Sequence, residues 1–252
     1  MARQRLGQHF LTSQHILERI AIAACGDHCP LVIEIGPGKG ALTSHLLGHG
    51  DRVIALELDR ELAAELPSRC SNDPKLEVIE GDALAIDWAQ FGPAVFAGNL
   101  PYYAATPLMQ KCWNAGPELA LRGVFLIQAE VAARLTAKPG NRDYGYLSVE
   151  AQLMSHVDSL FRVKPGSFSP PPKVDSAVVR IVPKIDGPVQ QDERAPFLKF
   201  VGICFRQKRK TLRNNLAAAY SRGQIESLDI GSRRAEELTI LEFAALYRAL
   251  VP

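Results

Sequence analysis

The chain contains Leu31-Val32-Ile33-Glu34-Ile35-Gly36-Pro37-Gly38-Lys39-Gly40, an apolar run that leads directly into a glycine-rich turn. The run is short and rich in β-branched residues, which is typical of a buried strand. Residues 41–47 have a helical composition, so the turn joins a strand to a helix. Glycines at such a junction let the backbone turn sharply and approach a ligand closely. The stretch therefore predicts the first strand–helix unit of a ligand-binding α/β sheet.

The alternation of strands and helices continues along the chain. Further strands are predicted at 52–56, 76–80, 94–98 and 123–128, and helices at 60–70, 106–115, 129–137 and 145–155. This order is typical of a parallel sheet with right-handed crossovers. Two last strands, at 157–163 and 176–182, have no helix between them and can pair antiparallel at one edge. We therefore expect an α/β fold with a mostly parallel seven-stranded sheet.

The pattern changes after Val182. Residues 183–188 hold Pro, Asp and Gly, which is typical of a linker. From Pro196 onward the sequence is helical in character and contains no strand candidate. We predict an α/β domain over residues 1–183 and a small α-helical domain over residues 189–252.

Composition excludes several classes of protein. The 252 residues are 47% hydrophobic with a net charge of only +2, so no global basic field dictates a nucleic-acid partner. Five scattered cysteines favour a reducing compartment over a disulfide framework. Residues 25–29 could form half of a zinc site, but no second Cys/His pair completes it, so no metal is predicted. We expect neither a signal peptide nor a membrane span, and therefore a cytoplasmic protein.

Polar residues follow the ends of successive predicted strands. Glu57 ends the second strand, 21 residues beyond Gly36, where a carboxylate can hold the two hydroxyls of a ribose. Asp82 follows the third strand and can accept from an adenine amino group, and Asn99 ends the fourth. Carboxyl ends of parallel strands meet at one edge, so these residues are predicted along one rim. Glu57 is also compatible with an exposed strand end, and Asp82 with a helix cap.

The glycine turn is compatible with two classes of cofactor. Gly36, Gly38 and Ala41 also fit the G-x-G-x-x-[GA] pattern of dinucleotide-binding proteins, such as nicotinamide-dependent oxidoreductases. Glu34, however, would repel a pyrophosphate and favour a cationic amine or sulfonium. Pro37 also removes one backbone donor that a phosphate could use. An oxidoreductase leaves the next two motifs without a purpose.

The first of these motifs is Asn99-Leu100-Pro101-Tyr102. The Asn side-chain oxygen and the Leu100 carbonyl can accept the two N–H bonds of an aryl amine. Those bonds would steer the nitrogen towards tetrahedral geometry and aim its lone pair at a methyl donor. Tyr102 can stack on the ring. The motif is also compatible with a simple turn before a helix.

The second motif is Arg206-Gln207-Lys208-Arg209-Lys210-Thr211-Leu212-Arg213, which carries five basic residues and no acid. If the segment is helical, Arg206, Arg209, Lys210 and Arg213 share one face. An apolar face behind it would comprise Phe197, Val201, Phe205, Leu212 and Leu216. A basic stripe of this kind suits a phosphate backbone. The alternative is an ordinary solvated helix face.

Together these motifs resemble the class I S-adenosylmethionine-dependent methyltransferases. More narrowly, the chain is similar over nearly its whole length to the ribosomal RNA adenine dimethyltransferases of the KsgA family. The pieces that carry the resemblance are residues 7–11, 34–40, 57–59, 81–83, 99–102, 144–148, 168–176 and 206–216. The resemblance implies a Rossmann-like class I methyltransferase fold, with an antiparallel edge strand and a small C-terminal α-helical domain.

The resemblance also implies the roles of individual residues. The residues that would bind S-adenosylmethionine are His9, Leu11, Glu34, Gly36, Gly38, Glu57, Asp82, Ala83 and Asn99. Many relatives have Asn where this chain has His9. The target adenine would be held by Asn99, Leu100 and Tyr102, and Phe168 would stack on its other face, although Phe168 is also compatible with ordinary loop packing. The RNA-binding residues would be Arg206, Lys208, Arg209, Lys210 and Arg213.

The implied reaction is in-line methyl transfer to the exocyclic amine of two adjacent adenosines. They lie in a hairpin near the 3′ end of 16S rRNA, within a small ribosomal subunit precursor. Water can take the proton, so no general base is assigned. We expect a monomer. The alternatives are a resistance-type methyltransferase of large-subunit RNA, an adenine methyltransferase of DNA, and an RNA-binding assembly factor whose methylation is vestigial.

Overall fold

A computed structural model describes residues 9–251, so Gly7 and Gln8 of the N-terminal motif lie outside the described residues. The chain divides into two compact units. Unit 1 comprises Met1–Ala132 and Ser155–Lys184, and unit 2 comprises Ala133–Met154 and Ile185–Pro252. The sequence placed a boundary between 183 and 189. The structure divides the chain after Lys184 and also assigns residues 133–154, which form a helical excursion between two strands, to unit 2.

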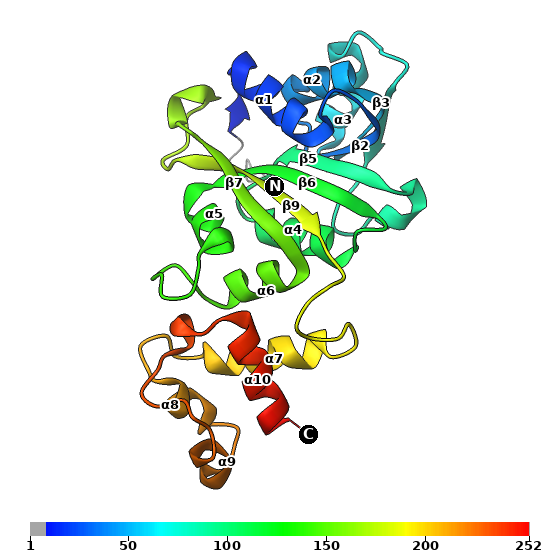
Figure 1. The fold of residues 1–252 in the computed structure, drawn as a ribbon. Helices are drawn as coiled ribbons and strands as arrows, with labels where there is room; N and C mark the ends of the chain where they lie inside the picture. The colour runs from blue at the N-terminus through cyan, green and yellow to red at the C-terminus, as the bar shows by residue number, and fades with distance from the viewer. Residues whose placement is uncertain (1–8, 252) are drawn as a thin grey trace, which may run out of the picture. The chain divides into compact units, whose positions relative to one another are not determined.

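Unit 1 is built on a seven-stranded sheet with the order β4-β3-β2-β5-β6-β9-β7 (Figure 1). The strands are β2 (Cys29–Ile35), β3 (Gly50–Glu57), β4 (Leu76–Glu80), β5 (Ala94–Asn99), β6 (Ala120–Gln128), β7 (Ser155–Val163) and β9 (Ser176–Pro183). The five strands from β4 to β6 are parallel, and β9 is antiparallel to both β6 and β7. The predicted strands and the mostly parallel α/β fold are therefore confirmed, with the antiparallel β9–β7 pair at one end of the sheet.

The parallel register brings the predicted strand-end residues to one edge. Ile35 pairs with Leu56, and Glu57 pairs with Glu80, so the loops after β2, β3 and β4 begin side by side. On the other side of β2, Glu34 pairs with Ala97, two residues before the end of β5. The sheet therefore places the glycine loop, Glu57, Asp82 and Asn99 along one rim.

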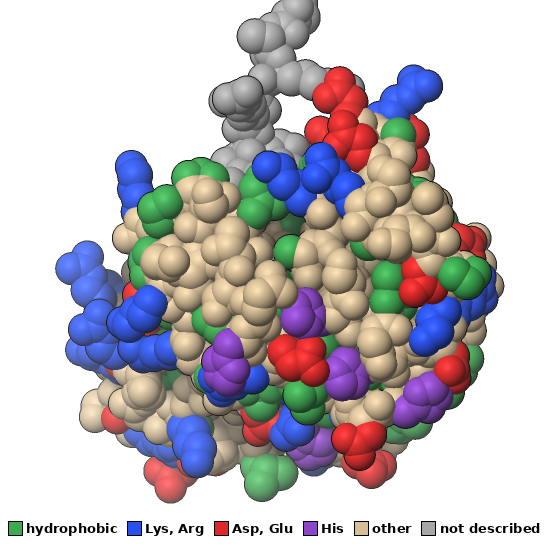
Figure 2. Space-filling view, turned by 90° about the horizontal axis from the view of Figure 1, so that it is seen from above, with side chains coloured by type: hydrophobic (Ala, Val, Ile, Leu, Met, Phe, Trp, Pro, Cys, Tyr) green, Lys and Arg blue, Asp and Glu red, His purple; other side chains and the backbone are tan. Residues whose placement is uncertain are grey.

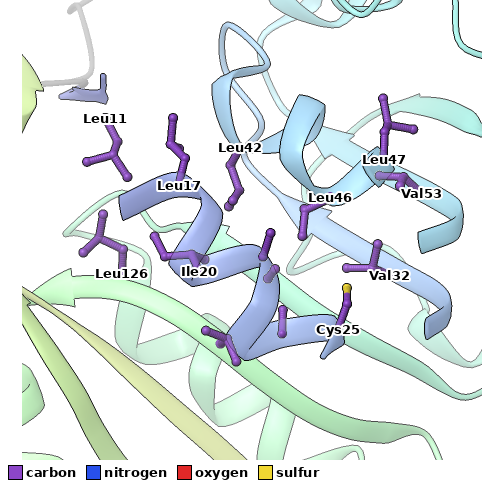
Figure 3. Close-up of a cluster of buried hydrophobic side chains, with 14 of the residues drawn as sticks. Leu11, Leu17, Ile20, Cys25, Val32, Leu42, Leu46, Leu47, Val53 and Leu126 are labelled. Carbon is purple, nitrogen blue, oxygen red and sulfur yellow. The ribbon is translucent and has the colours of Figure 1, made fainter. Parts of the chain in front are cut away.

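Helices cover both faces of the sheet (Figure 1). They are α1 (Gln14–Cys25), α2 (Ala41–His49) and α3 (Arg60–Arg69) on one face and α4 (Ala105–Asn114) on the other. The sequence analysis missed α1, although its buried residues Leu17, Ile20, Ala21 and Ala24 follow a helical period. In Figure 3 the side chains of α1 and α2 point towards those of β2, β3 and β6, and Leu11 joins them from the N-terminal side. This apolar cluster fixes the helix that follows the glycine loop.

An acidic side chain also fastens α1 to α2. The two carboxylate oxygens of Glu18 lie 2.7 Å from Nδ1 of His45 and 3.0 Å from Nε2 of His49. These hydrogen bonds hold the pKa of Glu18 below its ordinary value. Histidines are visible across this face of the molecule in Figure 2. The hydrogen bonds of Glu18 add a polar contact between α1 and α2 to the apolar contact that the two helices make in the buried cluster.

A second, two-stranded sheet belongs to unit 1 and was not predicted. It pairs β1 (Phe10–Leu11) antiparallel with β8 (Phe168–Ser169), so that Leu11 lies opposite Phe168. A 3₁₀ turn, η2 (Pro165–Ser167), precedes β8, and another, η1 (Trp88–Phe91), precedes β5. Strands of two residues carry no periodic signal, which is why the sequence did not reveal them.

Unit 2 is helical, as predicted for the C-terminal region. Its elements are α6 (Tyr146–Met154), α7 (Arg194–Cys204), α8 (Leu212–Leu216), α9 (Arg222–Glu226), η3 (Ala235–Glu237) and α10 (Ile240–Leu250), and α5 (Ala129–Thr136) crosses from unit 1. Ser221 and Thr239 begin α9 and α10 with reciprocal capping boxes. Among residues 9–251, no helix has the length and apolarity that a membrane crossing demands.

Candidate active site and basic loop

The glycine loop between β2 and α2 has the conformation that its sequence requires. Gly36 and Gly40 have φ angles of 68° and 84°, which side-chain-bearing residues rarely adopt. The Gly36 N–H donates to the carbonyl of Leu56 at 2.9 Å, which ties the loop to the end of β3. A Cβ atom on Gly38 would lie 3.0 Å from Cε1 of Phe10. The loop is therefore closely covered by the ring of Phe10, a residue that the sequence analysis did not single out.

Glu57 is buried, with 5% of its surface exposed, so the alternative of an exposed strand-end carboxylate is wrong. One carboxylate oxygen accepts from the Gly38 N–H at 2.9 Å and the other from the Asp59 N–H at 2.9 Å. Each oxygen retains a second lone pair. The carboxylate thus holds the glycine loop against β3 and still has acceptors for the hydroxyls of a ribose.

Glu34 lies deeper than the sequence suggested. It is 1% exposed, and its Oε2 accepts from the hydroxyl of Thr43 in α2 at 2.6 Å. Desolvation raises its pKa to about 8, against the hydrogen bond from Thr43, and the nearby charge of Glu57 adds to the rise. Glu34 therefore links β2 to α2. Because a carboxyl group with this pKa is protonated and neutral at pH 7, it offers no full charge to a cationic cofactor, and its role towards the cofactor stays a prediction.

Asp82 and Ala83 lie in a loop directly after β4. Oδ1 of Asp82 accepts from the Leu84 N–H at 2.8 Å, which closes a turn of this loop. No helix begins at Leu84, so the helix-cap alternative is wrong. Among the described residues, its other oxygen, Oδ2, has no recorded hydrogen bond. The Asp82 side chain is exposed and the adjacent Ala83 is 8% exposed. A backbone bond from Gly81 N–H to the Glu57 carbonyl, at 2.8 Å, sets this loop beside the end of β3.

The Asn99 side chain is oriented by the N-terminal segment. Its Nδ2 donates to the backbone carbonyl of His9 at 2.9 Å, which leaves Oδ1 as an acceptor. The N–H of Leu100 is also occupied, because it donates to the Leu126 carbonyl at 3.1 Å. Within the part of the chain that the structure describes, neither Asn99 Oδ1 nor the Leu100 carbonyl has a recorded partner. These two oxygens are the pair that the sequence analysis assigned to the amine.

The ring of His9 lies near the ring of Tyr102, the last residue of the Asn99 motif. Their ring centroids are 6.0 Å apart, and the Tyr102 hydroxyl is 3.1 Å from Oγ of Ser176 in β9. The Nδ1 of His9 donates to the Pro170 carbonyl at 2.8 Å. His9 thus connects the Asn99 motif to the segment that follows β8. The cofactor contact of its side chain stays a prediction.

Phe168 and Leu11 face each other across the β1–β8 pair. Phe168 is 5% exposed and belongs to the same apolar cluster as Leu11 and Leu126. The loop-packing alternative is therefore present in this conformation. Stacking of Phe168 on a base stays a prediction, and it requires the ring to leave this cluster.

The basic segment is a loop, and the prediction of one helical face is wrong. α7 ends at Cys204 and α8 begins at Leu212, so Arg206, Arg209 and Lys210 lie between helices. The cause is Asn215, 4% exposed, whose Oδ1 accepts from the Gln207 N–H and whose Nδ2 donates to the Gln207 carbonyl. These bonds replace the helical ladder. The apolar residues behind the segment are buried, apart from the half-buried Phe205.

The basic loop nevertheless presents its charges to solvent. Arg206, Lys208, Arg209, Lys210 and Arg213 are all exposed. Lys208 reaches the Arg142 carbonyl and lies 3.9 Å from a carboxylate oxygen of Glu236. No ion pair is recorded, among the residues described, for the other four. The sequence missed Asn215 because a buried amide in a short helix has no local signature.

The half zinc site of residues 25–29 is not completed. Cys25 and Cys29 are both buried in the apolar cluster of unit 1. Over residues 9–251, no group of three or more His, Cys, Asp or Glu side chains has an arrangement that could hold a metal ion.

Known proteins resemble this chain over its full length. The family model for ribosomal RNA adenine dimethylase matches residues 1–250. The chain belongs to the ribosomal RNA adenine dimethylase family. Ribosomal RNA small subunit methyltransferase A of Acinetobacter baylyi is 40% identical, and the match covers 100% of this chain and 93% of that protein. The protein of the same name from Hahella chejuensis is 41% identical, with 97% and 91% covered.

Solved structures agree with this family assignment. A dimethyladenosine transferase from Plasmodium falciparum superimposes with a TM-score of 0.77 at 28% identity, covering 95% of this chain and 96% of that one. The 23S rRNA methyltransferase ErmE gives a TM-score of 0.75 at 24% identity, covers 96% and 100%, and shows the shared fold alone. The dimethylase is thus a class I methyltransferase in fold, and its methyl donor is S-adenosylmethionine.

Proposed function

We propose that this dimethylase transfers methyl groups from S-adenosylmethionine to two adjacent adenosines near the 3′ end of 16S rRNA, during small ribosomal subunit biogenesis in the cytoplasm. It acts as a monomer on a precursor particle. The relatives named for the small subunit, which align over nearly their whole length, support this choice of substrate.

One observation carries the chemistry of the proposal. The Asn99 amide is fixed by the His9 carbonyl, and its Oδ1 and the Leu100 carbonyl are available acceptors at the end of β5. Two acceptors on adjacent residues can bind the two N–H bonds of an exocyclic amine and orient its lone pair. Glu57, Asp82 and the glycine loop lie on the same rim to hold the donor. The rate enhancement then comes from positioning and hydrogen bonding rather than from a strong base.

The direct experiment is to incubate the protein with methyl-labelled S-adenosylmethionine and unmodified small or large ribosomal subunits, and to map the label. We expect dimethyladenosine at two adjacent positions in small-subunit RNA. Label confined to the large subunit would replace the proposal with the resistance-type alternative. If S-adenosylmethionine binds but no subunit is labelled, the proposed substrate is wrong.

The basic loop is proposed to bind the RNA backbone, because its cations are exposed and largely unpaired. Replacing Arg206, Arg209 and Lys210 with Gln is expected to weaken particle binding about 10- to 30-fold at moderate salt. The slope of log K against log[salt] should fall by roughly 2–3, at about 0.7–0.9 for each phosphate that the loop no longer neutralises. Filter binding across a salt series measures both quantities.

The matched control removes three cations that already have carboxylate partners. Arg52, Arg69 and Arg180 pair with Glu77, Glu65 and Asp158 at 2.5, 2.6 and 2.8 Å. Their replacement by Gln changes the net charge equally and is expected to leave the salt slope within experimental error. An equal reduction of the slope in both triple variants would mean that overall charge, and not this loop, governs binding.

A further inference from the structure

Lys111 extends from α4 to the loop that carries Asp82 and Ala83. Its Nζ donates to the carbonyl oxygens of Ala83 and Leu84, at 3.0 and 2.9 Å, and also to that of Ile86. An ammonium group has three N–H donors, so all three are used on one short stretch of backbone. Few side chains could make the same set of bonds, because the acceptors converge on a single point.

Trp88 holds the same loop from within the core. Its Nε1 donates to the Ala83 carbonyl at 3.0 Å, and its ring, 2% exposed, stacks on Phe96 with centroids 4.3 Å apart. The Lys111 ammonium lies 4.8 Å from the centre of the Trp88 ring, a distance suited to a cation–π contact. The Ala83 carbonyl therefore receives two hydrogen bonds, one from each residue.

The charge of Lys111 has a structural purpose at this place. Three carbonyl dipoles that point to one spot repel one another unless a cation lies between them. Desolvation lowers the pKa of Lys111, and the carboxylates of Asp87 and Asp82 act in the opposite direction. The lysine thus balances both the carbonyls and the two acids that flank the loop.

We propose that Lys111 is a positioning residue for the cofactor, holding residues 82–86 in the conformation that binds the adenine of S-adenosylmethionine. The inference rests on the proposed placement of the adenine at Asp82 and Ala83. If the loop occupies this conformation only a fraction of the time, the apparent Kd rises by the inverse of that fraction. α4 follows the Asn99 motif directly, so one helix supports the loop and begins beside the methyl acceptor.

The test is the Lys111→Met variant of the full chain, which keeps the length of the side chain and removes its charge and donors. We expect the Kd of S-adenosylmethionine to rise about tenfold, which equals about 1.4 kcal/mol of lost preorganisation. The Kd of adenosine should rise by the same factor. The kcat at saturating S-adenosylmethionine should stay within about twofold, because the loop does not touch the reacting amine.

Lys75 supplies the matched control. Its Nζ also donates to two backbone carbonyls, those of Leu47 and Gly50, both at 3.2 Å. Lys75 precedes β4, however, and so lies at the amino end of that strand, whereas the Asp82 loop follows its carboxyl end. Like Lys111→Met, Lys75→Met removes backbone hydrogen bonds and is expected to lower the free energy of unfolding. It is expected to leave the Kd of S-adenosylmethionine and the Kd of adenosine unchanged. A Kd within twofold of the wild type in Lys111→Met, or an equal rise in Lys75→Met, would overturn the proposal.

A second variant keeps the test decisive if Lys111→Met does not fold. Trp88→Phe removes the indole N–H to the Ala83 carbonyl and keeps a ring against Phe96. It is expected to raise the Kd of S-adenosylmethionine and of adenosine together, by about two- to fivefold. No change in either Kd would contradict the role of the loop. Both measurements omit RNA, so their outcome is independent of whether the small subunit is the substrate.

Discussion

Asn99→Ala is expected to lower kcat about 10²- to 10³-fold, the usual cost of losing one preorganised hydrogen bond to a transition state. The loss should appear equally in kcat and kcat/KM, because the bond matters most as the amine becomes tetrahedral. Binding of the ribosomal particle should persist, since the basic loop is unchanged. Single-turnover methylation and particle binding, measured on the same preparation, separate the chemistry from RNA binding.

Asn114→Ala provides a control within unit 1. Asn114 is the last residue of α4, is exposed and carries the same carboxamide at the far end of the helix. We expect its kcat to match the wild type. If Asn99→Ala keeps a kcat within threefold of the wild type, the assignment of Asn99 to the amine is wrong. Loss of particle binding in Asn99→Ala would also show that the variant tests more than the chemistry.

Glu34→Gln is expected to change how the stability of the protein depends on pH. The pKa of Glu34 is about 8 in the folded protein, raised from an ordinary value of 4.5 that the unfolded chain retains. Between these values the folded state keeps a proton that the unfolded chain has released, so stability falls as pH rises and levels off above about 8. From pH 6 to 9 the wild type should lose roughly 3 kcal/mol of unfolding free energy from this group, at 1.36 kcal/mol per pKa unit.

Gln resembles the protonated carboxyl group and can still accept from the Thr43 hydroxyl, so the variant should lack this loss. Urea unfolding at several pH values measures it. Glu80→Gln is the control, because Glu80 pairs with Glu57 across the sheet but is exposed. Its pH profile should follow the wild type. Parallel profiles for Glu34→Gln and the wild type would mean that Glu34 is ionised in the folded protein.

Local patterns in the sequence were sufficient for the α/β framework. Short apolar runs and glycine turns predicted all seven strands of the main sheet, and parallel pairing then placed Glu57, Asp82 and Asn99 on one rim. Each of these inferences depends on residues close together in the chain. The helix α1 was missed, although its buried residues Leu17, Ile20, Ala21 and Ala24 follow a helical period.

The parts that could not be predicted depend on contacts between distant residues. Nothing near Asn99 indicates that the His9 carbonyl orients its amide, and nothing near Phe10 indicates that it covers Gly38. The basic segment has a helical pattern of charges, yet the buried Asn215 amide bonds to Gln207 and opens the backbone. The hydrogen bonds from the Lys111 ammonium to three backbone carbonyls likewise depend on the packing of α4 against the loop after β4.

The pairing of β1 with β8 has a consequence for how the protein is made. His9 and Pro170, which hydrogen-bond to each other, are separated by 161 positions. During synthesis β1 is translated well before β8, at a rate of about 5–20 residues per second, and cannot pair until β8 has been made. The segment that orients Asn99 can take its final position only after most of unit 1 has been translated. Closing so large a loop carries a high entropic cost, and we expect the methylation site to be completed late in folding.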